Sequence, residues 1–302
     1  MAATVCARKF NSTIREMNWG WLFAVLATSL WVHVPGLTPF ATMCGISLSL
    51  FAVIKLHVLT NYRKSNSRPG LLEVAAWFVG WPGLDAKAFF SARTVDRPGT
   101  LEWMFAVAKI GFGGWMLVWM ATALRPTSDL LAGWAALIGI VFLLHFGSFH
   151  FAALFWQTRG RNVKPIMNGP VLATSVTEFW SRRWNLAFRD YASPFLFVPL
   201  MRRTNSVAAV LIGYTFSGLV HELAISVPAK AGYGFPTLYF LIQGLAMLIE
   251  RAADKRGVRI TNGLRGWLWT ATITVPAAYL LFHPPFIRAI VLPVVNSIAG
   301  LT

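Results

Sequence analysis

The chain has 302 residues, of which 56% are hydrophobic and only 13% carry a formal charge. Soluble domains carry charge on about 25% of their residues, so a soluble globule of this size could not cover its surface. The net charge of +16 would suggest nucleic-acid binding in a soluble protein, but here the basic residues lie between long apolar runs. The composition therefore excludes a soluble nucleic-acid-binding domain and predicts an integral membrane protein.

Several apolar runs are long enough to cross about 30 Å of hydrocarbon. A shorter run at 71–84 contains Gly80, Pro82 and Gly83 and is predicted to be re-entrant or interfacial. The run 286–301 is marginal because Pro293 interrupts it. No small-residue cleavage site follows the first run, which predicts a retained span instead of a signal peptide. In chain order, we expect spans at residues 18–34, 37–59, 101–124, 130–156, 206–227, 235–249 and 264–282.

The basic residues give these spans an orientation. With the N-terminus, including Arg8, Lys9 and Arg15, in the cytoplasm, most of the 27 lysines and arginines fall on the cytoplasmic side. The opposite loops hold Arg125, Lys230 and Arg288. No internal repeat or second domain is visible, so residues 1–302 are expected to form one multispanning domain. The compact, alanine-rich chain suggests a bacterial inner membrane, or the endoplasmic reticulum if the source is eukaryotic.

One histidine lies deep in a predicted span. His221 and Glu222 follow the small residues Ser217 and Gly218, which permit close helix packing. Ionisable groups at this depth are costly and point to function, and a neutral imidazole can accept a proton as a general base. A histidine that only bonds a neighbouring helix is the structural alternative. A zinc site is not predicted, because Ile225 stands where the second histidine of H-E-x-x-H would be.

Other residues give no metal or disulfide site. The two cysteines, Cys6 and Cys44, lack metal spacing. His145 and His150 are five residues apart, which places them on different faces of a helix. We therefore expect no bound metal.

A second constellation is Glu178-Phe-Trp-Ser-Arg-Arg-Trp-Asn185. It is compatible with an interfacial helix that has aromatic anchors and snorkelling arginines. In the functional alternative, Asn185 points inward as a hydrogen-bonding group, while Arg182 and Arg183 bind phosphates.

These two segments together resemble the membrane-bound O-acyltransferase superfamily, and within it the wax synthase domain family of long-chain-alcohol O-fatty-acyltransferases. In that family the segment matching Phe179–Asn185 reads Phe-Trp-Gly-Arg-Arg-Trp-Asn, so Ser181 is a departure. The segment Ser217-Gly-Leu-Val-His-Glu222 follows about 35 residues later, as in the family. The resemblance covers residues 164–293 most densely, and Lys55-Leu56, Trp81-Pro-Gly83 and Leu281–Phe286 also look familial.

The resemblance implies an all-α fold of about eight transmembrane helices, with re-entrant or interfacial helices around a central catalytic cavity. It also implies transfer of an acyl group from acyl-CoA to the hydroxyl of a lipid alcohol. His221 would be the general base and Asn185 would assist it, with Glu222, Ser217 and Trp184 in support. Acyl-CoA would be a co-substrate, with no bound cofactor. Five cations on the cytoplasmic side are candidates to bind it: Arg159, Arg161, Lys164, Arg182 and Arg183.

Two alternatives remain open at this point. The acceptor could be a sterol, a diacylglycerol, a secondary metabolite or a glycan, with acetyl-CoA as a further donor. A transporter could instead use His145, His150, His221, Glu222 and Lys109 as a proton path. The absence of repeated halves argues against transport. The sequence does not indicate the oligomeric state.

Overall fold

The structure, a computed structural model, describes residues 28–66, 68–91 and 95–300. Helices are its regular elements, and no β-strand occurs among the described residues, which confirms the all-α prediction. Of the expected first span, residues 28–33 are helical. Residues 18–27 of that span, and the basic residues before them, lie outside the described residues.

Four continuous rods are long and apolar enough to cross a membrane. A bent pair, α15–α16 with α17–α18, would make a fifth span, with an angle of 55° at the break. The four rods are α2 (Pro39–Ser65); α5 (Thr100–Trp115), η1 (Met116–Met120) and α6 (Ala121–Leu124); α7 (Asp129–Ile140), η2 (Val141–Ser148) and α8 (Phe149–Thr158); and α12 (Ser206–His221), η6 (Glu222–Ser226) and α13 (Val227–Ala229). The predicted number of about eight spans is therefore not confirmed.

The C-terminal part of the chain supplies the remaining long elements. α14 (Phe235–Lys255) has 21 residues, but its last turns contain four charged residues, so it does not qualify as an apolar span. The expected span 264–282 is interrupted. Its elements and those that follow are α15 (Gly263–Thr274), α16 (Ala278–Leu281), α17 (Pro284–Phe286), η7 (Ile287–Val291) and α18 (Leu292–Ile298).

Short helices connect the rods at one end. α3 (Leu71–Gly80) has 10 residues, about 15 Å of helix, which is too short to span a membrane. Its Leu71, Leu72 and Val79 side chains are exposed, as the interfacial interpretation of this run predicts. The other short elements are α4 (Ala86–Phe90), η3 (Pro170–Leu172), α9 (Val176–Glu178), η4 (Phe179–Arg183), α10 (Leu186–Ala192), η5 (Ser193–Phe197) and α11 (Val198–Arg203).

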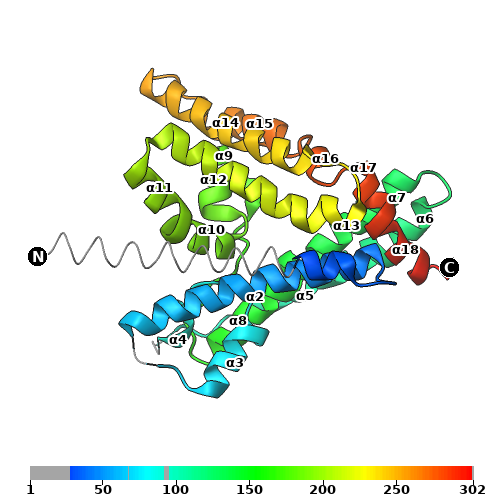
Figure 1. Ribbon diagram of the computed structural model, residues 1–302, viewed down its shortest axis with the longest axis horizontal. Coiled ribbons are helices and arrows are strands. Elements are labelled where there is room, and N and C mark those ends of the chain that lie inside the picture. The colour runs from blue at the N-terminus through cyan, green and yellow to red at the C-terminus, as the bar shows by residue number, and fades with distance from the viewer. Residues whose placement is uncertain (1–27, 67, 92–94, 301–302) are drawn as a thin grey trace, which may run out of the picture.

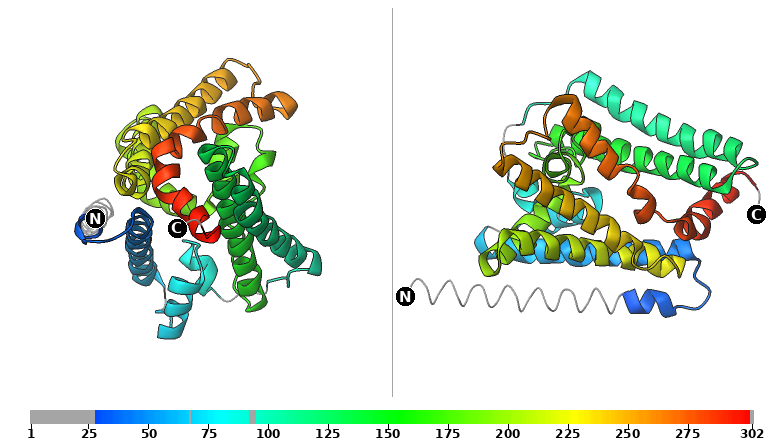
Figure 2. Two further views of the ribbon diagram at one scale, coloured as in Figure 1. Left: turned by 90° about the vertical axis from the view of Figure 1, so that its right-hand side faces the viewer. Right: turned by 90° about the horizontal axis from the view of Figure 1, so that it is seen from above.

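In Figure 1, α12, α14 and α15 lie in the upper half and α2, α5 and α8 in the lower half. Figure 2 shows the same helices end-on and from above. α11 and the C-terminal ends of α2 and α14 lie at the left of Figure 1, whereas α6, α13 and α17 lie at the right. The loops predicted to be cytoplasmic thus gather at one end, which we call the basic end.

Helix α12 packs closely against α14. A Cβ added at Gly218 would lie 2.6 Å from Thr237 Cα, and one at Gly244 would lie 3.2 Å from the Tyr214 ring. Such small residues let two backbones approach in a membrane helix pair. This contact holds the His221 helix against α14.

Candidate active site

The Glu178–Asn185 segment begins with a well-capped helix. The Ser175 hydroxyl accepts a hydrogen bond from the Glu178 N–H at 2.9 Å, as a serine N-cap does. The chain then passes through the π-helical turn η4. π-Helical turns are rare and are often found at functional sites, and η6, which begins directly after His221, is another.

A buried carboxylate from α14 anchors the start of this segment. Glu250 is only 4% exposed. Its Oε1 accepts from Val176 N–H at 2.6 Å and Trp269 Nε1 at 2.9 Å. Its Oε2 accepts from the Thr177 N–H at 2.9 Å and the Thr177 hydroxyl at 2.6 Å. All four acceptor positions are filled by donors, and a negative charge is stabilised at the start of a helix.

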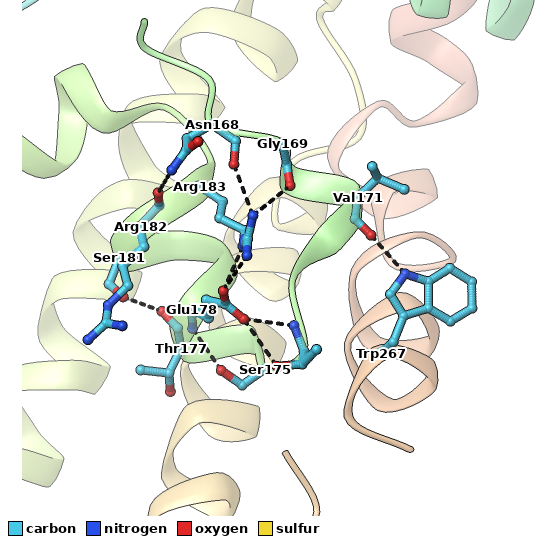
Figure 3. Close-up of polar contacts among 11 residues, drawn as sticks. Asn168, Gly169, Val171, Ser175, Thr177, Glu178, Ser181, Arg182, Arg183 and Trp267 are labelled. Atoms are coloured by element: carbon cyan, nitrogen blue, oxygen red, sulfur yellow. Dashed lines mark hydrogen bonds and ion pairs between the residues drawn. The ribbon is translucent and has the colours of Figure 1, made fainter. Parts of the chain in front are cut away.

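Arg183 is held inside the segment (Figure 3). Its Nε and Nη2 donate to Glu178 Oε1 at 2.7 and 2.6 Å, and its Nη1 donates to the Asn168 and Gly169 carbonyls. Burial alone would raise the pKa of the Glu178 carboxyl, but the Thr174 N–H and Arg183 hold that pKa below its ordinary value. This carboxylate therefore stabilises the fold at neutral pH, and the contribution is lost as the pH falls through its lowered pKa.

Arg182 differs from its neighbour. Its side chain is exposed and points away from the Glu178–Arg183 pair, and its backbone carbonyl accepts from Asn168 Nδ2. On the other side of the network, Trp267 of α15 donates to the Val171 carbonyl at 2.7 Å. Of the two adjacent arginines, Arg182 is the one whose guanidinium remains available to a ligand.

Asn185 occupies a left-handed backbone position, with φ of +42°. Asparagine tolerates this conformation better than most residues. Its Oδ1 accepts from the Phe188 N–H at 3.3 Å and so caps α10. The structure therefore gives Asn185 a turn-forming function that the sequence prediction did not include, and its side chain makes no hydrogen bond with His221.

The aromatic residues of the segment link it to the His221 helix. Trp180 donates to the fully buried Gln243 at 3.2 Å, and its ring centroid lies 5.5 Å from that of Phe240. The His221 ring lies 4.5 Å from the same Phe240 ring. Trp184 stacks on Phe179 at 5.5 Å. The two predicted site segments thus meet through Phe240 of α14.

The His221 imidazole has a defined tautomer. Its Nδ1 lies 2.7 Å from the Ser217 carbonyl oxygen, which can only accept a hydrogen bond. Nδ1 therefore carries the proton and Nε2 keeps its lone pair. The Ser217 hydroxyl donates to the Gly213 carbonyl, so Ser217 orients the histidine through its backbone. The arrangement leaves Nε2 as the basic atom.

Glu222 contacts the N-terminal end of α14, opposite to the end that carries Glu250. The Oε1 of Glu222 accepts from the Gly234 N–H, the Thr237 N–H and the Thr237 hydroxyl, at distances of 2.9 to 3.1 Å. The carboxylate thus caps the start of α14, while Glu250 near its end caps α9. α14 is consequently the element that fixes His221 and the Glu178–Asn185 segment relative to each other.

The remaining candidate cations are placed differently. Arg161 donates to Glu73 at 2.8 Å and to the Phe89 carbonyl at 3.2 Å, so it fastens α3 to the loop after α8. The Arg159 guanidinium lies 5.0 Å from the Phe155 ring. Lys164 is exposed and lines a cavity.

The other buried histidines do not extend the site. His283, expected at a span end, is completely buried. Its Nδ1 accepts from the Phe286 N–H, so Nε2 carries the proton and donates to Ser226. That serine therefore cannot be activated by this histidine. Lys109 Nζ lies 3.2 Å from His150 Nδ1. Among the described residues, neither of these two side chains is hydrogen-bonded to His221. No group of three or more potential metal ligands occurs among the described residues.

Comparisons with known proteins match this part of the chain. The sequence profile of the membrane bound O-acyl transferase family matches residues 163–242. Residues 163–242 are thus similar to that family. The matched residues run from the loop before α9 to the middle of α14, and they include both Asn185 and His221.

Curated relatives agree with this membrane bound O-acyl transferase assignment. The long-chain-alcohol O-fatty-acyltransferase of Simmondsia chinensis is 31% identical over 45% of this chain and 42% of its own length. The probable long-chain-alcohol O-fatty-acyltransferase 2 of Arabidopsis thaliana is 32% identical over 45% of this chain and 43% of its own. The acyl-CoA–sterol O-acyltransferase 1 of the same plant is 28% identical over 42% and 39%. The chain therefore matches less than half the length of these relatives.

The resemblance to the wax synthase domain family of the membrane-bound O-acyltransferases is thus confirmed. Together with the long apolar helices, it identifies an integral membrane protein.

Proposed function

We propose that the protein transfers an acyl group from acyl-CoA to the hydroxyl of a lipid alcohol, as a wax ester synthase does. The observation that carries the proposal is the hydrogen bond from His221 Nδ1 to the Ser217 carbonyl, which leaves Nε2 as a base within a membrane helix. The matching relatives, which are named as long-chain-alcohol O-fatty-acyltransferases, support the acceptor.

His221 acts as the general base. Nε2 takes the proton of the acceptor hydroxyl, and the alcohol oxygen attacks the thioester carbonyl carbon. The tetrahedral intermediate then collapses, the carbon–sulfur bond breaks, and the CoA sulfur takes the proton back from Nε2. An ester and free CoA leave, and the histidine returns to its starting state.

Asn185 and α14 assist this reaction. The Asn185 Oδ1 caps α10, while its Nδ2 makes no hydrogen bond within the described chain. We assign Nδ2 to the polar atoms of a substrate. Glu222 and Ser217 position His221, and Trp184 packs beside the segment. Keeping water from the thioester limits hydrolysis, which a site inside the bilayer favours.

The basic end faces the cytoplasm in this proposal, because acyl-CoA is a cytoplasmic anion and the positive-inside rule places basic loops there. The composition favours a bacterial inner membrane for this chain, although the curated relatives are plant proteins.

A sterol acceptor is the second candidate, because one relative is named as an acyl-CoA–sterol O-acyltransferase. The two are separated by one assay. Purified protein in nanodiscs receives radiolabelled palmitoyl-CoA with hexadecanol, a sterol, a diacylglycerol or no acceptor. We expect a labelled wax ester with hexadecanol. A labelled sterol ester in its place would select the second candidate.

Folded protein that releases no CoA with any acceptor, or with acetyl-CoA and non-lipid acceptors, would contradict acyl transfer. Solute movement into liposomes by the same preparation would then support a transporter.

The two adjacent arginines should respond differently to replacement. Arg182→Ala removes an exposed guanidinium and is expected to raise the KM for acyl-CoA with little change in thermal stability. Arg183→Ala leaves Glu178 without its ion-pair partner, so the unfolding temperature should fall. Steady-state kinetics and thermal unfolding in detergent check both. Equal effects of the two replacements on KM and stability would contradict the assignment of Arg182 to ligand binding and of Arg183 to the fold.

A further inference from the structure

Two adjoining cavities form a groove at the basic end. One has a volume of about 490 Å³ and lies between the end of α2, the start of α4 and α10–η5. The other has a volume of about 320 Å³ and lies between the loop 162–166 and α10. Asp85, Arg189 and Asp190 line both cavities. We call the combined space the α4–α10 groove.

The groove has free cations at its edges and carboxylates at its centre. Lys87 lines the larger cavity and Lys164 the smaller; both are exposed, with no ion-pair partner among the described residues. Arg189 contacts Asp190 at 2.7 Å and the Ser181 carbonyl at 3.4 Å. Asp85 caps α4 through Oδ1. Burial raises the pKa of Asp190, while the adjacent Arg189 guanidinium opposes that rise and offsets the negative charge of the carboxylate.

The groove lies beside the Asn185 end of the candidate site. Leu186 and Ala187, which line the smaller cavity, directly follow Asn185, and the Leu186 N–H donates to the Ile166 carbonyl at 2.9 Å. His221 ends the 16-residue helix α12, so it lies about 22 Å along that helix from the basic end. A donor that reached Nε2 from the cytoplasm would therefore need a long, thin arm and a polar head that stays near the basic end.

We propose that the α4–α10 groove binds the nucleotide end of the acyl-CoA donor, with its phosphates against Lys87 and Lys164. The adenine amino group and the ribose hydroxyl donate to Asp85 and Asp190, because carboxylates accept and cannot donate when ionised. The inference rests on the proposed acyl transfer. It replaces two of the sequence candidates, Arg161 and Arg183, whose guanidinium groups are bonded within the protein.

The test compares two acyl donors. The variant Lys87→Ala with Lys164→Ala is assayed with palmitoyl-CoA and with the palmitoyl thioester of N-acetylcysteamine, which lacks the nucleotide. Loss of two charge-assisted contacts should raise the KM for palmitoyl-CoA but not the KM for the short thioester. We expect the ratio of the first KM to the second to rise about 10- to 100-fold. The matched control, Arg202→Ala with Lys255→Ala, removes the same charge from exposed positions at the same end and should leave the ratio unchanged.

A ratio that stays at the wild-type value in the groove variant, or that rises equally in the control, would overturn the proposal. Binding of adenosine 3′,5′-bisphosphate, measured by calorimetry, tests the groove separately from turnover. We expect wild-type binding and at least tenfold weaker binding by the groove variant. If the wild type turns over neither donor, acyl transfer fails while this binding result still decides the groove. Binding abolished by phosphatidylglycerol in the nanodiscs would assign the groove to a lipid headgroup and overturn the proposal.

Discussion

Replacement of His221 by alanine is expected to lower turnover by roughly 10²–10⁴, which is the usual contribution of a general base. The structure names the atom responsible. Nδ1 is occupied by the Ser217 carbonyl, so Nε2 alone can accept the proton of the acceptor hydroxyl. His221→Gln should be as inactive, because a side-chain amide is not a base at neutral pH. Ester formation from labelled palmitoyl-CoA measures both variants.

His33 provides a matched control. Its Nδ1 lies 2.7 Å from the Ser29 carbonyl one helical turn earlier, the same intrahelical contact as in His221, but it is exposed and away from α14. His33→Ala should therefore retain wild-type turnover. Near-normal turnover in a folded His221→Ala variant would eliminate this histidine as the base.

Replacement of Glu250 by glutamine is expected to have the largest effect on stability. The carboxylate accepts four hydrogen bonds and is 4% exposed. A glutamine places an NH₂ group against N–H donors, whichever way the amide is turned. Hydrogen bonds to a charged group contribute about 1.5–3 kcal/mol each, so the loss should be about 3 kcal/mol or more. Thermal unfolding in detergent measures it.

Turnover should also fall in Glu250→Gln at temperatures where the protein remains folded, because the start of the Glu178–Asn185 segment is no longer anchored to α14. Glu73→Gln is the control. It removes a carboxylate of similar chemistry that pairs with Arg161 while 40% exposed, and exposed ion pairs contribute about 0–1 kcal/mol. If the two variants unfold at the same temperature, Glu250 does not anchor the segment.

The sequence proposed His221 and Asn185 as site residues but did not show what supports them. These two residues stood out because a histidine within an apolar run and a familial motif are visible in the order of residues. Glu250 was not predicted, since it is the first charge after an apolar run and its donors lie on Val176, Thr177 and Trp269, which are 19 to 74 residues away in the chain. Arg183 was assigned to a phosphate because no sequence pattern reveals that Glu178 and two backbone carbonyls already occupy it.

The span count shows a related limit. Residues 71–84 were predicted not to cross, and they contain the 10-residue helix α3, which is shorter than a membrane span. The expected span 235–249 lies within the continuous helix α14, whose last turns are charged. The expected span 264–282 is part of a bent pair, because α15–α16 is followed by a break before α17. The position at which a helix bends depends on its packing against neighbouring helices as well as on the length of the apolar run.

The sequence by itself indicated the helical class, the membrane setting and the resemblance to a family, because these follow from composition, apolar run length and local motif order. Only the tertiary structure decided which atoms act together. It assigned the His221 tautomer, joined His221 and Trp180 through Phe240, and made α14 the common support through Glu222 and Glu250. The physical reason is that hydrogen bonds and ring contacts depend on distances between residues remote in the chain, which packing alone sets.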